Sequence, residues 1–207
     1  MKTTIEKFNL VPLVMIITLA CMLLVSGCAR YARTVNTFYD PSATVRSGSG
    51  NIYVIIPENQ ITQSSDVKWV LGNVKNDDNK TIDDVYSSRS PAEIIQAAFS
   101  QEFQKAGYTV IPATKRTGTE ERVLDLTTSK IQLEQISDVM DIKAKCRVLV
   151  GVDVFKNGQL LKRLQYEATS SKTDIKDRDL LAESVLQESL KSIMKQAVPE
   201  LQGIISH

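Results

Sequence analysis

The sequence predicts an α+β domain in which two amphipathic helices pack on one face of a mainly antiparallel sheet. Three observations support this fold class: several runs with apolar residues at every second position, two segments with apolar residues spaced by three and four, and an order in which most strands follow one another directly. We expect one domain over residues 52–207, because a chain of this length can bury a single core.

Two strands are predicted before the first helix. Residues Ile52–Ile56 form a mostly β-branched run that ends at Pro57, which is typical of a strand covered on both faces. Residues 67–74 alternate between two sides and predict a second strand. Residues 75–84 are polar, and we interpret them as a solvated loop, because their acidic residues lack the order of a calcium-binding loop.

The first helix has the clearest local signal in the chain. Ser90 provides an N-cap, a proline occupies the first helical position, and Glu93 completes a capping box. One apolar stripe follows at spacings of three and four: Ile94, Ile95, Ala98, Phe99, Phe103 and Ala106. The helix is therefore expected over residues 91–106, and a short strand over residues 108–111 should follow it directly.

A long hairpin is predicted next. Residues 123–137 and 142–154 alternate between apolar and polar side chains, and the apolar side of the second run includes Cys146. Asn157-Gly158 marks a turn into a returning strand over residues 159–170.

Two registers are possible for this hairpin. A two-residue turn at Asn157-Gly158 would place Val152 opposite Arg163, a polar residue on the apolar face. A three-residue loop that begins at Lys156 avoids this mismatch. We therefore predict the pairs Val154 with Leu160, Val150 with Leu164, Val148 with Tyr166 and Cys146 with Ala168.

A final helix follows an N-cap at Asp177 or Asp179. Its broad apolar stripe contains Leu181, Val185, Leu186, Ser189, Leu190, Ile193, Met194 and Ala197. We expect it to run to about Val198, where Pro199 ends or kinks it. Residues 201–205 then form a short turn that packs on the domain or is offered to a partner.

The first 27 residues have the three parts of a secretory signal: a basic start, an apolar run and small residues at the end. An uncleaved membrane-spanning helix is the alternative interpretation. The junction Val25-Ser26-Gly27-Cys28 resembles the bacterial lipobox. This resemblance implies cleavage between Gly27 and Cys28, a diacylglycerol on the Cys28 thiol and an N-acyl chain on its new amine.

Residues 28–51 are then a lipidated cysteine and a flexible tether, with a root-mean-square reach of about 25 Å. Several acyl chains on one residue hold a protein stably on a membrane. The residue after the cysteine is Ala29 and not the aspartate that retains lipoproteins at the inner membrane. We therefore expect the periplasmic face of the outer membrane, with the inner membrane as the less favoured location.

Composition argues against several other classes of protein. The chain has 25 basic and 24 acidic residues, so no nucleic-acid partner is indicated. Cys146 is the only thiol left after cleavage and acylation, and its place on an apolar strand face predicts burial. The only histidine is His207, and no metal-ligand cluster or phosphate loop occurs. We expect no catalytic residues, no metal and no cofactor beyond the covalent lipid.

The order of elements, together with the run Phe103-Gln104-Lys105-Ala106-Gly107-Tyr108-Thr109-Val110, resembles the YajG-like uncharacterised bacterial lipoproteins. A wider resemblance is to the periplasmic lipoproteins that accompany ABC-type transporters and lipopolysaccharide assembly. These resemblances imply a class and a location, but they carry no catalytic residues to this chain.

Two functional hypotheses follow. The first is a non-enzymatic structural or interaction lipoprotein that docks on an envelope complex through its sheet face or a sheet edge. The second is a lipid-handling auxiliary subunit of a transport or assembly system, which needs an apolar cleft. Trp69, Tyr108 and Tyr166 are candidates for lining such a groove, and aromatic core packing is the alternative role for them. The sequence does not indicate an oligomeric state.

Overall fold

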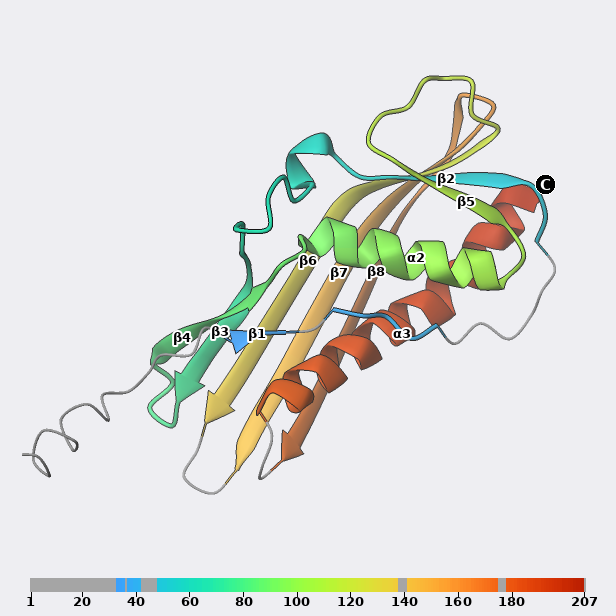
Figure 1. Ribbon diagram of the computed structural model, residues 1–207. Helices are drawn as coiled ribbons and strands as arrows, with labels where there is room; N and C mark the ends of the chain where they lie inside the picture. The colour runs from blue at the N-terminus through green and yellow to red at the C-terminus, as the bar shows by residue number, and fades with distance from the viewer. Residues whose placement is uncertain (1–32, 36, 42–47, 138–140, 175–177, 207) are drawn as a thin grey trace, which may run out of the picture. The chain divides into compact units, whose positions relative to one another are not determined.

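The computed structural model describes residues 33–35, 37–41, 48–137, 141–174 and 178–206, and it confirms the α+β class (Figure 1). Eight strands form one sheet. The strands are β1 (Arg33–Thr34), β2 (Asn51–Ile55), β3 (Trp69–Asn76), β4 (Thr81–Ser87), β5 (Thr109–Ala113), β6 (Arg122–Ser137), β7 (Ile142–Lys156) and β8 (Gln159–Asp174). The helical elements are η1 (Glu58–Gln60, a 3₁₀ turn), α2 (Pro91–Lys105) and α3 (Arg178–Ser206).

The sheet is mixed, so the expectation of a mainly antiparallel sheet is wrong. Strand β6 pairs antiparallel with β7 on one side, and on its other side it pairs parallel with both β2 and β3. Parallel pairing also joins β1 with β4 and β2 with β5. The reason lies in the connections. Residues 57–68 carry the chain forward along β6, from β2 opposite Asp125 to β3 opposite Leu133, so both strands run parallel to β6. Helix α2 carries the chain back to the start of β5, which pairs parallel with β2.

The expected polar loop over residues 75–84 is a hairpin. Strand β3 continues to Asn76, whose side-chain oxygen accepts a hydrogen bond from the backbone N–H of Lys80 (2.8 Å), and Asn79 takes a left-handed conformation with φ 62°. Strand β4 then begins at Thr81. Its apolar pattern was hidden because adjacent aspartates occupy its middle and only Val85 and Ser87 are buried.

The three-residue loop predicted between β7 and β8 is also wrong. Lys156 pairs with Gln159 across a two-residue turn. Both turn residues are left-handed, with φ 51° at Asn157 and 80° at Gly158. Left-handed residues at both central positions are what a tight hairpin turn requires.

One extra residue in β8, Leu161, keeps the apolar faces aligned despite the tight turn. Phe155 pairs with Leu160, but Val154 pairs with Lys162, so the register shifts at this bulge. Beyond it the pairs are Val152 with Leu164, Val150 with Tyr166, Val148 with Ala168 and Cys146 with Ser170. The mismatch foreseen for a plain two-residue turn is thus corrected within the strand and not within the turn.

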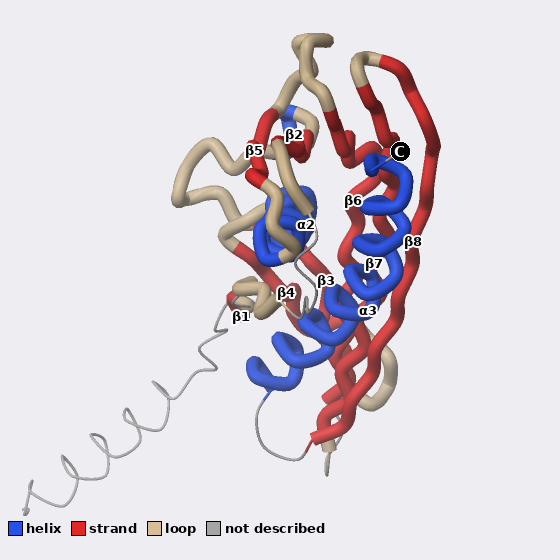
Figure 2. Tube along the Cα trace, turned by 90° about the vertical axis from the view of Figure 1, so that its right-hand side faces the viewer, coloured by secondary structure: helices blue, strands red, loops and turns tan. Residues whose placement is uncertain are grey.

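One large core cluster contains buried side chains from both helices and from the strands. Figure 1 shows α2 and α3 in front of β6, β7 and β8, and the tube in Figure 2 shows α3 running beside β7 and β8. Ser189 of α3 donates its hydroxyl to the backbone carbonyl of Cys146 in β7 (3.0 Å). The largest fully buried side chains include Phe99, Phe103, Ile52, Ile56, Leu71, Leu124, Leu186 and Leu190.

Helix α2 begins as predicted. The Ser90 hydroxyl accepts from the Glu93 backbone N–H (3.1 Å), and the Glu93 carboxylate accepts from the Ser90 backbone N–H (2.8 Å). The helix ends at Lys105 with Gly107 left-handed at φ 106°.

Helix α3 is longer than predicted and continues through Pro199 to Ser206. A proline inside a helix removes one backbone hydrogen bond. Beyond it Leu201 and Ile205 are fully buried in the main core. The last turns therefore pack on the domain, and burial of these two side chains offsets the hydrogen bond lost at the proline.

Residues 33–41 were expected to belong to a flexible tether, but the described ones pack on the domain. Val35 and Tyr39 are 2% and 5% exposed and join the main core. Residues 32–207 form one compact unit. The described residues of this segment therefore pack with the domain. The sequence did not indicate this packing, because two apolar side chains four residues apart are a weak signal.

Gly72 allows β3 to approach β6, and its replacement tests this arrangement. A Cβ at position 72 would lie 1.6 Å from the carbonyl oxygen of Leu133, while a Cβ at Gly203 in α3 has no neighbour within 4 Å. We expect Gly72→Ala to lower the free energy of unfolding by about 2–4 kcal/mol. Gly203→Ala should raise it by about 0.5–1 kcal/mol.

Urea denaturation of the domain without its signal measures both variants. Equal stability of Gly72→Ala and the unchanged protein would contradict the close approach of β3 to β6.

Candidate functional site

The predicted lipidation site Cys28 and the cleavage position Gly27 lie outside the described residues. Their roles stay predictions. Within the described ranges, no helix has both the length and the apolar character needed to cross a bilayer.

The three aromatic residues proposed to line a groove occupy three separate environments. Trp69 donates its indole N–H to a threonine of the segment before β3 (2.9 Å). Tyr108 packs edge-on against Phe103 with ring centroids 5.7 Å apart. Tyr166 donates its hydroxyl to Glu200 of α3 (3.1 Å), and burial together with this hydrogen bond raises the pKa of Tyr166. They therefore do not form one shared lining.

Cys146 is fully buried among the core residues of β7, as its apolar position predicted. Burial raises the pKa of its thiol to about 12. A reactive cysteine needs a lowered pKa and access to solvent. This thiol has neither property, and its role is to fill the core.

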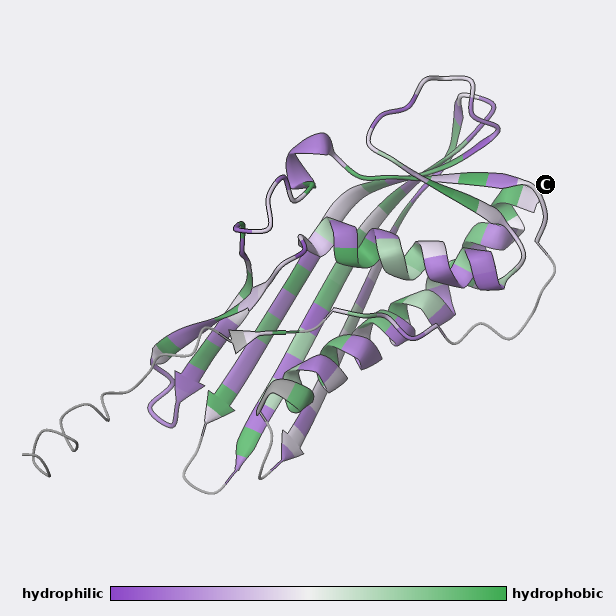
Figure 3. Cartoon of the chain, in the orientation of Figure 1, coloured by the Kyte–Doolittle hydropathy of each residue, from purple (hydrophilic) through white to green (hydrophobic). Residues whose placement is uncertain are grey.

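The side of the sheet opposite the main core, which we call the open face, is polar. Along β7 the exposed residues Lys143, Lys145 and Arg147 alternate with buried Ala144 and Cys146. Figure 3 shows this alternation of hydrophilic and hydrophobic residues along β6, β7 and β8. A sheet with one buried and one polar face leaves the polar one available to solvent or to a partner.

Ion pairs between neighbouring strands organise the open face. They join Lys75 with Glu134, Arg147 with Glu167 and Arg163 with Asp153. The Arg147 guanidinium donates two hydrogen bonds to the Glu167 carboxylate (2.7 and 3.0 Å). This interaction holds the pKa of Glu167 below its usual range. The pairs fix the positions of long side chains that would otherwise be mobile.

A trough of about 540 Å³ lies on this face where β3 and β4 meet β6 and β7. Its lining includes Val70, Gly72, Asn73, Lys75, Asp84, Gln132, Glu134, Lys145 and Arg147. One of these groups, Lys145, is exposed and makes no ion pair with any described residue. A second group, the side-chain oxygen of Asn73, is buried without a hydrogen-bond partner. Buried polar atoms in native proteins normally have partners, so the Asn73 oxygen marks the trough as a binding candidate.

Two carboxylates face each other further along the open face. Asp125 of β6 lies directly opposite Asp153 of β7. Burial, reinforced by the charge of Asp153, raises the pKa of Asp125, while Arg116 opposes this shift. Like charges on directly opposed residues weaken a strand pair. Two ion pairs compensate for this repulsion: Arg116 pairs with Asp125 (3.6 Å), and Arg163 pairs with Asp153 (3.3 Å).

A small second core lies beside this carboxylate pair, at the end of the sheet where β6 begins. Its buried members are Ile55, Val123 and Phe155. The Arg116 guanidinium stacks over the Phe155 ring at 3.9 Å. The loop before β6 is thereby attached to the hairpin of β7 and β8.

Sequence reasoning missed the trough because its two halves come from β3 and β6, whose parallel pairing could not be foreseen. The alternating lysines and arginine of β7 were the signal that did identify the polar face. Glu134 and Asn73 carried no signal of their own, because isolated polar residues on strands are ordinary.

The comparisons with known proteins give only distant structural similarities. No family model matches the chain, and no curated protein matches it. A DUF330-family protein from Xanthomonas campestris is 10% identical, with 81% of this chain and 92% of that chain covered and a TM-score of 0.45. A protein from Helicobacter pylori, described as a homologue of a neuraminyllactose-binding hemagglutinin, is 9% identical. The match covers 81% of this chain and 94% of that chain, with a TM-score of 0.41.

Rare lipoprotein B from Shewanella oneidensis is 12% identical, with 66% of this chain and 98% of that chain covered and a TM-score of 0.36. None of these values assigns a family. The resemblance to the YajG-like lipoproteins therefore stays a prediction.

The buried carboxylate of Glu120 makes the stability of the loop before β6 depend on pH. The Glu120 carboxylate accepts hydrogen bonds from the backbone N–H groups of Thr117 and Gly118 (2.6 and 2.8 Å). These hydrogen bonds lower the pKa of Glu120 from 4.5 to about 2. A depressed carboxyl pKa stabilises the fold above the unfolded pKa, and this contribution is lost as the pH falls through the folded pKa.

We therefore expect Glu120→Gln to lower the melting temperature at pH 7, and the difference from the unchanged protein should shrink as the pH falls from 4.5 towards 2. The exposed neighbour Glu121 provides the control, since Glu121→Gln should show a small and nearly constant difference. Thermal denaturation across this pH range measures the difference in melting temperature between each variant and the unchanged protein. A constant deficit for Glu120→Gln would show that its charge is not what stabilises the loop.

Proposed function

We propose that this protein is a bacterial lipoprotein held at the periplasmic face of the outer membrane through acylated Cys28, and that its domain docks non-enzymatically on an envelope protein complex. The signal and the lipobox-like junction at Gly27-Cys28 support the anchor. The open face of the sheet supports the docking role.

The observation that carries this proposal is the trough on the open face. It combines an apolar rim residue, Val70, with the free charge of Lys145 and the unpartnered oxygen of Asn73. Protein interfaces combine apolar contact with about one hydrogen bond per 100–200 Å². The paired charges around the trough hold this surface in one arrangement before a partner arrives, which lowers the entropy cost of binding.

The alternative function, a lipid-handling auxiliary subunit of an ABC-type transport or lipopolysaccharide-assembly system, would use a cleft between sheet and helices. The side chains that would line such a cleft, among them Phe99 and Leu186, are fully buried in one contiguous core. The three aromatic candidates lie apart. Core packing in the described ranges therefore favours the docking role.

A non-enzymatic role agrees with the chemistry of the described side chains. The Cys146 thiol is buried with a raised pKa, which is the reverse of an activated nucleophile. The charged residues of the open face are mostly held in ion pairs between strands. Such pairs suit recognition of a surface better than proton transfer.

Charge reversal in the trough tests the docking role. We expect Lys145→Glu to remove the main stoichiometric crosslinked species when the acylated protein is isolated from its own envelope after brief crosslinking. Lys195→Glu introduces the same charge change at an exposed position on α3 and should leave that species unchanged. Mass spectrometry of the crosslinked material measures both.

The docking proposal fails if Lys145→Glu and Lys195→Glu give the same crosslinks as the unchanged protein. Circular dichroism of both variants excludes a loss of folding as the cause of any difference.

A further inference from the structure

The point where the described chain joins the sheet is fixed. Strand β1 pairs parallel with β4, with Arg33 opposite Val85 and Thr34 opposite Tyr86. The backbone N–H of Val35 also donates to the carbonyl of Tyr86 (2.9 Å). Arg33, the first residue that the structure describes, is therefore held in a defined position at the β4 edge of the sheet.

Contacts of the segment after β1 with both helices hold β1 in place. The Tyr39 hydroxyl donates to the Glu102 carboxylate of α2. Lys191 of α3 contacts the Asp40 carboxylate at 2.9 Å, and Lys105 of α2 donates to the carbonyl of Pro41 at 2.8 Å. Releasing residues 33–41 would expose Val35 and Tyr39 and break contacts to both helices.

The remaining chain between the predicted anchor and the domain is short. Five residue steps separate Cys28 from Arg33, and even a fully extended chain covers at most about 18 Å over that number. A tether that continued to residue 51 would reach several times further when extended. An acylated Cys28 thus keeps the β1–β4 edge within about 18 Å of the bilayer surface.

The position of Arg33 selects one end of the sheet. Arg33 pairs with Val85 of β4, and through Gly72 of β3 it is level with Leu133, which is four residues from Ser137 and eleven from Arg122 of β6. At that end Asn76 of β3 pairs with Ser137 of β6. The opposite end, where Arg122 pairs with Lys156, is the full 16-residue length of β6 away, or about 50 Å.

Exposed apolar side chains gather around the same edge. Seven large apolar residues are exposed among those described. Apart from Val70, which lines the trough, three of them belong to β4, to the residues just before β3 or to the segment after β1: Phe38, Val67 and Ile82. Exposed apolar groups mark surfaces that contact a partner or a membrane. The β3–β4 turn beside Ile82 has mixed charge, with Asp77, Asp78 and Lys80, which suits zwitterionic phospholipid headgroups.

We propose that the edge formed by β1, β4 and β3 rests on the bilayer surface against zwitterionic headgroups, and that the Arg122–Lys156 end of the sheet projects away from the membrane. This inference rests on the proposed anchor at Cys28. It places the loop before β6 and the β7–β8 turn furthest from the lipid, while the trough on the open face faces the space beside the membrane.

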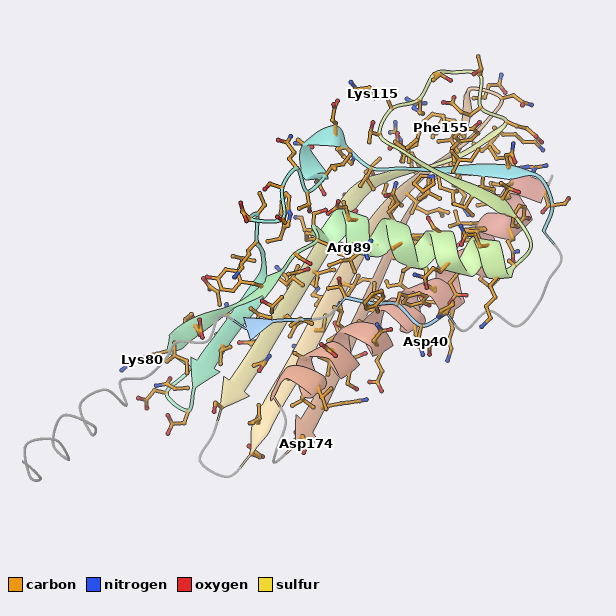
Figure 4. The ribbon with its side chains drawn as sticks, viewed as in Figure 1. Asp40, Lys80, Arg89, Lys115, Phe155 and Asp174 are labelled. Atoms are coloured by element: carbon orange, nitrogen blue, oxygen red, sulfur yellow. The ribbon has the colours of Figure 1, made fainter. Side chains whose placement is uncertain are left out.

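Two lysines at opposite ends of the domain provide matched positions for a test (Figure 4). Lys80 in the β3–β4 turn and Lys115 in the loop before β6 have 77% and 74% exposed side chains. Each is replaced by cysteine in turn and labelled with a fluorescent donor. The buried Cys146, with its raised pKa, does not compete for the label.

The acylated protein is reconstituted into phosphatidylethanolamine and phosphatidylcholine vesicles that carry a headgroup-attached rhodamine acceptor. Since the two ends of the sheet are about 50 Å apart, energy transfer from position 80 should exceed that from position 115 by about threefold or more. Insertion of a Gly/Ser segment of about 20 residues after Tyr31 gives a reach of about 25 Å and should reduce the transfer from position 80.

Flotation of the vesicles separates failure of the orientation from failure of the anchor. If the acylated protein floats but both positions transfer equally, or if the insertion changes nothing, the orientation is overturned while the anchor stands. If Cys28→Ser floats as well as the unchanged protein, the anchor is not at Cys28, and the proposed function and the orientation fail together.

Discussion

The fold depends on one shared strand. Strand β6 pairs with β7 along its whole length and, on its other side, with β2 near its start and β3 near its end. This double pairing joins elements far apart in the sequence into one sheet, and it requires β3 to come so close to Leu133 that only a glycine fits at position 72. The core, the trough and the β4 edge all take their positions from this strand.

The two faces of the sheet then have different roles. Alternation along β6 and β7 directs one set of side chains into a core that both helices share, and the other set onto the open face. The ion pair of Arg147 with Glu167 shows how that face is ordered without burial, since the partners come from neighbouring strands. A rigid polar face on one side of a filled core supports the proposed docking role over that of a lipid carrier.

The sequence predicted the parts of the fold that rest on local signals. The capping box at Ser90 and Glu93 located the start of α2, and the alternation around Cys146 identified the two faces of β7. It failed where tertiary contacts decide. The adjacent aspartates of β4 masked its apolar pattern, so this strand was not predicted. The bulge at Leu161 shifts the pairing of β8 by one residue, which aligns the apolar faces despite the tight turn. The trough could not be predicted, because Asn73 and Glu134 become neighbours only through the parallel pairing of β3 with β6.

The packing of β1 on β4 leaves only five residue steps between the described domain and Cys28, the proposed anchor. Amide hydrogen exchange of the acylated protein measures this packing, by comparing a peptide that covers residues 33–41 with peptides from β4. We expect protection of the Val35 amide close to that of its partner strand, because this N–H donates to Tyr86. Exchange of residues 33–41 as fast as that of an unstructured peptide would contradict it and return these residues to a flexible tether.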